Sequence, residues 1–131
     1  MMVASGASYN VAIGEGALSG ATGGMQGDNN VAIGRTSMTN ATNPQENVAI
    51  GNQSMQYATT AARNIGIGYL GLRNATSAVD NVAIGYYALV TNVDGDKNIA
   101  IGSKALYSFE PSDGAGENVA IGFEAGYDLN T

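Results

Sequence analysis

The sequence predicts an all-β fold, a parallel β-solenoid built from seven coils of 17–20 residues. The first sign is a motif of five residues, Asn-Val-Ala-Ile-Gly with small variations, that occurs seven times. The second sign is its spacing of 17 or 20 residues, because a fixed period of this length indicates stacked structural units. We therefore expect one domain over residues 1–131, in which residues 1–9 form an N-terminal cap or linker and repeats begin at positions 10, 30, 47, 64, 81, 98 and 118.

Each motif predicts one short strand. Its second and fourth positions are Val or Ile, which favour extended backbone, and its third is Ala, or Gly at position 66. Because side chains alternate along a strand, Val and Ile should share one face and Ala the other. The Gly at the fifth position should end the strand, and no 3.6-residue period supports a helix. We expect strands at 11–13, 31–33, 48–50, 65–67, 82–84, 99–101 and 119–121.

The Asn that opens each repeat predicts a ladder of stacked amides. In a solenoid, equivalent residues of successive coils lie above one another, so these side chains can hydrogen-bond along the stack. The alternative is that Asn only suits the turn backbone before the strand. Both interpretations make the column structural, and its members are Asn10, Asn30, Asn47, Asn64, Asn81, Asn98 and Asn118.

A second column consists of the residues that precede Asn from the third repeat on. Their charges alternate in sign, so each should face an opposite charge on the neighbouring coils. Exposed ion pairs contribute little stability, and the column should therefore fix alignment more than it adds free energy. Its members are Glu46, Arg63, Asp80, Lys97 and Glu117.

Both faces of the predicted strands are apolar, and this pattern predicts burial on both sides. A single narrow coil has only one interior. The second apolar face should therefore meet another chain, or another wall of a wide roll. We therefore expect a homo-oligomer arranged around a symmetry axis. The sequence does not determine which face of the strands lines that axis.

Composition excludes several classes of function. The net charge of −6 and the lack of a basic patch argue against nucleic-acid binding. The chain has no Cys and no His, so thiolate metal sites and the commonest general base are absent, and we expect no metal or cofactor. No segment is long enough to span a membrane, and the opening residues MMVASGASY lack the features of a signal peptide.

The stretches NVAIGEGAL, NVAIGYYAL and NIAIGSKAL resemble the head repeats of trimeric autotransporter adhesins and the repeats of phage and injection-system tail fibres. The resemblance covers residues 10–126. It implies a left-handed parallel β-roll, a homotrimer, and an extracellular role in binding on a virion, an injection-system fibre or a bacterial cell surface. The coils here are longer than is usual in the autotransporter heads, which favours the fibre branch. We expect a head or tip piece, or a short fibre module.

Function should lie where the coils differ, and the sixth and seventh positions vary most. Stacking should place Tyr69 beside Tyr86, with Leu70 and Tyr87 adjacent. A polar-tipped aromatic platform of this kind suits a sugar ring or a receptor loop. The alternative is that these residues only cover the sheet or contact a neighbouring chain.

The two longer repeats supply a second candidate. Each inserts three residues between strands, in 22–29 and 108–117, and loops on a rigid scaffold often bind partners. In the second loop, Phe109 with Glu110 and Asp113 is the most distinctive group.

The sequence therefore predicts a non-catalytic receptor-binding module of a surface fibre, which attaches multivalently to a cell-surface glycan or protein. A purely structural spacer is the alternative. A polysaccharide-degrading tailspike is a weaker one, with Asp94 and Asp96, or Glu110 and Asp113, as the acid pair. These acids lie in turns, where we expect no raised pKa and no catalytic residue.

Overall fold

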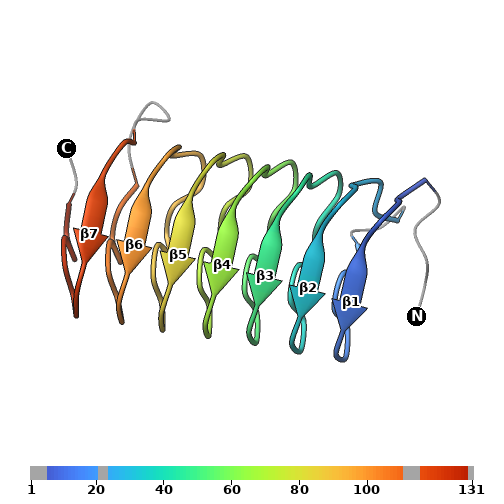
Figure 1. Ribbon diagram of the computed structural model, residues 1–131, viewed down its shortest axis with the longest axis horizontal. Coiled ribbons are helices and arrows are strands. Elements are labelled where there is room, and N and C mark those ends of the chain that lie inside the picture. The colour runs from blue at the N-terminus through green and yellow to red at the C-terminus, as the bar shows by residue number, and fades with distance from the viewer. Residues whose placement is uncertain (1–5, 21–23, 111–115, 130–131) are drawn as a thin grey trace.

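The computed structural model describes residues 6–20, 24–110 and 116–129 and confirms an all-β solenoid (Figure 1). Seven strands lie side by side in one parallel sheet, in the same order as in the chain. Each strand has three residues, at the positions that the motif predicts. They are β1 (Val11–Ile13), β2 (Val31–Ile33), β3 (Val48–Ile50), β4 (Ile65–Ile67), β5 (Val82–Ile84), β6 (Ile99–Ile101) and β7 (Val119–Ile121).

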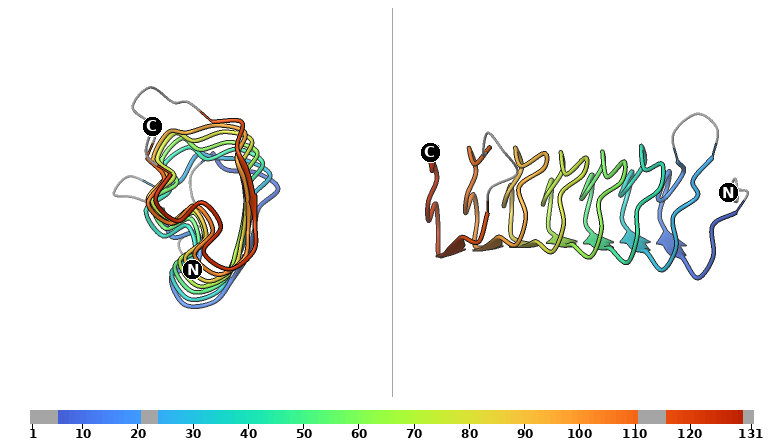
Figure 2. Two further views of the ribbon diagram at one scale, coloured as in Figure 1. Left: turned by 90° about the vertical axis from the view of Figure 1, so that its left-hand side faces the viewer. Right: turned by 90° about the horizontal axis from the view of Figure 1, so that it is seen from above.

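Successive coils stack with equivalent residues in register. In the sheet, Val48 pairs with Ile65 and Ile50 with Ile67, and the same register holds across the two longer repeats. Backbone hydrogen bonds also join the coils outside the strands, as from the Gln53 N–H to the Arg35 carbonyl at 3.0 Å. Viewed along the axis, the coils therefore superimpose, with one straighter side and one that bends inward (Figure 2).

The interior is narrow, and its apolar part consists mostly of Ala and of Leu and Met, none of which is branched at Cβ. The central Ala of the strands points inward, and Ala49 and Ala83 are fully buried. Opposite it lies the Leu or Met at the ninth position of the repeat, counting the Asn as position one. These side chains are also fully buried: Met38, Met55, Leu72, Leu89 and Leu106.

The Val and Ile side chains of the strands point outward. In the middle of the sheet, 37% of Ile65 and 36% of Ile84 remain exposed, although both have neighbouring coils on either side. The two-sided burial expected from the apolar pattern is therefore not achieved within one chain. We call this surface the Val/Ile face; it comprises the first and third residue of each strand, from Val11 to Ile121.

The Asn column forms a continuous hydrogen-bonded ladder inside the coil. Asn64 donates from its backbone N–H and its Nδ2 to Oδ1 of Asn47, at 3.0 and 3.1 Å, and from Nδ2 to the Ala78 carbonyl at 2.7 Å. Its own Oδ1 accepts the same two bonds from Asn81. Asn47, Asn64 and Asn81 are fully buried, so the ladder satisfies amide groups that have no access to water.

The charge column contains two ion pairs. Arg63 lies 2.7 Å from Asp80, and Lys97 lies 3.2 Å from Glu117. The hydrogen bond from Arg63 holds the pKa of the Asp80 carboxyl below its usual value. Glu46 adds a smaller attraction for Arg63. The alternation of sign therefore operates between neighbouring coils, although all these side chains are exposed.

The coils turn through left-handed backbone at positions that are not glycine. Nineteen described residues other than Gly have positive φ, among them Leu72 at 51° and Tyr87 at 58°. The fifth position needs Gly for a further reason. At Gly68, where φ is 125°, a Cβ would lie 2.5 Å from the carbonyl oxygen of Gly85 in the next coil.

Replacement of a ladder residue should destabilise the whole solenoid. Asn64→Ala leaves the buried amide groups of Asn47 and Asn81 without their hydrogen-bond partner, because the Ala side chain cannot replace the Asn64 amide. We expect the free energy of unfolding to fall by about 3 kcal/mol in a denaturant titration. Asn74→Ala, in the same coil, is the control: Asn74 is half-buried outside the ladder, and its loss should cost at most about 0.5 kcal/mol. Equal losses would contradict a stabilising ladder.

A second pair of variants tests the close approach of coils at the fifth position. Gly68→Ala should lower the free energy of unfolding by about 2 kcal/mol or more, because the added methyl group meets the backbone of the next coil. Gly71→Ala is the matched control: nothing lies closer than 3.4 Å to its Cβ, and the equivalent residues Ala88 and Ala105 are already alanine. A harmless Gly68→Ala would show that coils can separate locally.

Candidate functional site: a strip of stacked tyrosines

The Gly that ends each strand turns the chain so that the sixth position projects from the rod. Tyr69 and Tyr86 occupy this position in successive coils. Their rings stack, with centroids 5.6 Å apart and an angle of 17° between planes. The structure therefore brings together the two residues at the centre of the predicted aromatic patch.

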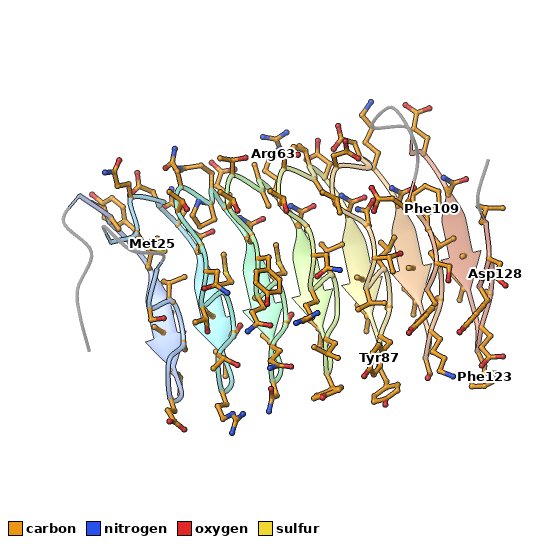
Figure 3. All side chains as sticks on the ribbon, turned by 180° about the vertical axis from the view of Figure 1, so that it is seen from behind. Met25, Arg63, Tyr87, Phe109, Phe123 and Asp128 are labelled. Atoms are coloured by element: carbon orange, nitrogen blue, oxygen red, sulfur yellow. The ribbon has the colours of Figure 1, made fainter. Side chains whose placement is uncertain are left out.

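The stack continues along the rod through three further rings. Tyr87 packs edge-on against Tyr86 at 4.4 Å and Tyr69 at 5.6 Å, and lies 5.8 Å from Tyr107. Tyr107 stacks on Tyr127, with centroids 4.9 Å apart and an angle of 4° between planes. These five residues span coils four to seven, and we call them the tyrosine strip. Figure 3 shows Tyr87 at the edge of the rod opposite Arg63.

The strip presents both ring surface and hydroxyl groups to solvent. Tyr69 is 42% exposed and Tyr86 is 50% exposed, whereas Tyr87, Tyr107 and Tyr127 are half-buried. Burial, followed by the neighbouring Tyr86, raises the pKa of Tyr87 above its ordinary value. A tyrosine is protonated at neutral pH even at its ordinary pKa, so Tyr87 can donate a hydrogen bond there.

Leu70 is the least exposed member of the predicted patch. Only 7% of it is exposed, although it occupies the same seventh position as Tyr87 in the next coil and has the same φ of 58°. Two members of the strip, Tyr107 and Tyr127, were absent from the prediction. The available signal was that both occupy the tenth position of their repeats, a column that the comparison of the sixth and seventh positions overlooked.

Two cations lie next to the strip. Arg73 precedes Tyr107 and Tyr127 in the column of tenth positions, and its guanidinium carbon lies 4.9 Å from the ring centroid of Tyr57. Lys104 lies 5.8 Å above the ring of Tyr127 and 3.4 Å from a carboxylate oxygen of Glu124. Cations in contact with aromatic faces are held by the ring quadrupole, so both have fixed positions.

The second candidate site, the loop 108–117, does not present Phe109 to solvent. Phe109 is 2% exposed and belongs to the core, where it fills the twelfth position that is Ala41, Ala58 or Ala75 in other coils. The buried Ala residues at the twelfth position of other coils could have identified Phe109 as a core residue. Asp113 lies outside the described residues.

Glu110 corrects a further expectation about the acidic residues. Its pKa is raised, chiefly by burial and then by the charge of Asp94, while a hydrogen bond of 3.1 Å from the Val93 N–H opposes the shift. Asp96 accepts a hydrogen bond of 2.7 Å from the Val79 N–H and thereby links the fourth and fifth coils.

The described residues contain no group of three or more acidic, His or Cys side chains placed to hold a metal ion. In the same part of the chain, no helix has the length and apolar character needed to cross a bilayer. No protein-family model matches the sequence, and no curated protein or solved structure gives a significant match.

Proposed function

We propose that this chain is a non-catalytic receptor-binding head of a surface fibre, and that it attaches to a cell-surface glycan or protein. The observation that carries the proposal is the tyrosine strip, a row of exposed aromatic rings on a rigid hydrogen-bonded rod. Aromatic faces with polar edges suit the C–H faces and hydroxyl groups of sugars. The likeness of the repeats to those of tail fibres and adhesin heads supports the same role, on a virion, an injection-system fibre or a bacterial cell surface.

The proposal includes a homotrimer, for which the Val/Ile face is the main support. This face carries only Val and Ile, two from each of seven strands, in flat parallel rows. A continuous exposed apolar surface of this kind marks a site of protein association. In a trimer, each chain covers the face of its neighbours.

Trimerisation gives the attachment its strength. Three tyrosine strips on one rod can engage repeated receptors together, so weak individual sites produce strong overall binding. The left-handed coil implied by the resemblance belongs to this proposal. The acidic surface, with a net charge of −6, agrees with a partner other than nucleic acid.

The second candidate, a structural spacer of a fibre, would need the ladder and the Val/Ile face but not the tyrosines. The spacer gives no reason for a continuous row of five tyrosine rings in contact along one edge of the rod. The tailspike alternative would need two acids around a bound sugar, and its sign would be consumption of a polysaccharide.

A charged substitution on the Val/Ile face should dissociate the trimer. For Val82→Lys we expect light scattering to give the mass of one chain, while the parent gives the mass of three, because burial of a lone ammonium group is prohibitive. Val93→Lys, an exposed position away from this face, should remain trimeric. If the parent chain itself has the mass of one chain, the trimer is wrong.

Removal of three rings of the strip should weaken attachment. We expect the variant with Tyr69, Tyr86 and Tyr107 all replaced by Ala to lose at least about tenfold in retention on receptor-bearing cells and glycan arrays. Tyr9→Ala, which removes an exposed ring outside the strip, should bind like the parent. Full retention by the triple variant would favour the spacer, and loss of sugar polymer on incubation would favour an enzyme.

A further inference from the structure

We infer that the ligand of the tyrosine strip is an anionic glycan, and that Arg73 binds its acidic group. This inference rests on the proposed function and narrows it to a class of ligand. Its basis is a positioned guanidinium group that no carboxylate of the described chain neutralises, at one end of a row of exposed aromatic rings.

Neutral partners from the preceding coil hold Arg73 in place. Its Nε donates to Oε1 of Gln56 at 3.0 Å, and its Nη2 donates to the hydroxyl of Tyr57 at 3.3 Å, while the group lies over the Tyr57 ring. A guanidinium group has five N–H donors in a planar fork. The three others have no partner among the described residues, although the side chain is already ordered.

The other well-ordered cations are neutralised. Arg63, Lys97 and Lys104 each lie within 4.0 Å of a carboxylate oxygen, whereas Arg73 forms no such pair within the described ranges. Arg35 also lacks a carboxylate partner there, but it is exposed and makes no side-chain hydrogen bond in the same part of the chain. Arg73 therefore combines a free charge with a fixed position.

The charge of Arg73 reaches the strip. It opposes the upward shift in the pKa of Tyr87, which lies at the centre of the strip. Arg73 also belongs to the same coil as Tyr69. A cation close to a bound ligand outweighs the net charge of the whole protein, because salt screens charges that lie more than about 10 Å away. An anionic group bound beside Arg73 is therefore attracted despite the acidic character of the chain.

The two kinds of group match an acidic sugar chain. The rings supply faces for pyranose C–H groups, and the free side of the Arg73 fork supplies parallel N–H donors for a carboxylate, sulfate or phosphate. Because the planar guanidinium fork can donate two parallel N–H bonds to two oxygens of one such group, it selects these oxyanions over single hydroxyl groups.

A glycan array with matched pairs tests this inference. Each uronic-acid glycan is printed beside its carboxyl-reduced form, and sulfated and phosphorylated glycans are printed beside their unmodified forms. We expect the parent protein to bind at least one acidic member about tenfold more tightly than its neutral counterpart. This preference should weaken as salt is raised. The acidic group of the glycan that binds most tightly shows whether Arg73 recognises a carboxylate, a sulfate or a phosphate.

Two variants identify the residue. Arg73→Gln should reduce binding of the acidic glycan to the level of its neutral counterpart and leave binding of the neutral one unchanged. Arg63→Gln makes the same change in charge at the edge of the rod opposite Tyr87 and should keep the preference (Figure 3). Circular dichroism melting of both variants verifies the fold.

The outcomes separate the two proposals. Equal binding of acidic and neutral partners, or a preference that survives Arg73→Gln in the folded protein, would overturn the anionic ligand while attachment to glycans stands. Binding to no glycan at all would overturn both the anionic ligand and the glycan-binding form of the proposed function.

Discussion

Hydrogen bonding between identical coils is the interaction on which the rest of this structure depends. One coil encloses one Leu or Met and a few small or polar side chains, as with Ala49, Met55 and Ala58 in the third coil, too small a core to fold alone. The Asn ladder adds directional bonds in that interior: Asn64 binds the amide of the coil below, a carbonyl group of the turn and the amide of the coil above. Because each Asn needs both neighbours, stability is a property of the stack.

This dependence allows backbone that the local sequence disfavours. Leu72 and Tyr87 adopt positive φ, which costs roughly 1–2 kcal/mol for a residue other than glycine. Isolated peptides of these residues would avoid it. In the stack, the Leu72 N–H donates to the Ala88 carbonyl at 2.9 Å and the Tyr87 N–H to the Tyr69 carbonyl at 3.0 Å, so the bonds between coils hold the strained turns. The same turns point Leu72 inward and Tyr87 outward.

The sequence repeat made the positions of the strands and the division of their side chains between two faces predictable. The motif located every strand, and its alternation placed Ala and Val or Ile on opposite faces, because both follow from the two-residue period of a strand. It did not reveal which face is interior: Ala49 is enclosed because the narrow coil admits only a small side chain there. Phe109 was misjudged because its neighbours 108–117 suggested a loop, whereas its position in the repeat sets its burial. Tyr107 and Tyr127 were overlooked because contacts between separate columns depend on how the coil bends.

The alternating charge column has a consequence for how the chain finds its fold. The motifs are nearly identical, so the ladder would accept a coil stacked on its next-but-one neighbour, with the intervening repeat looped out. If the repeat of Asp80 were skipped, Arg63 would lie against Lys97 and not against Asp80. If the repeat of Lys97 were skipped, Asp80 would lie against Glu117. Like charges in contact disfavour the shortened stack, and opposite charges favour the complete one. The charge column thus disfavours folded states in which one of the near-identical repeats is skipped.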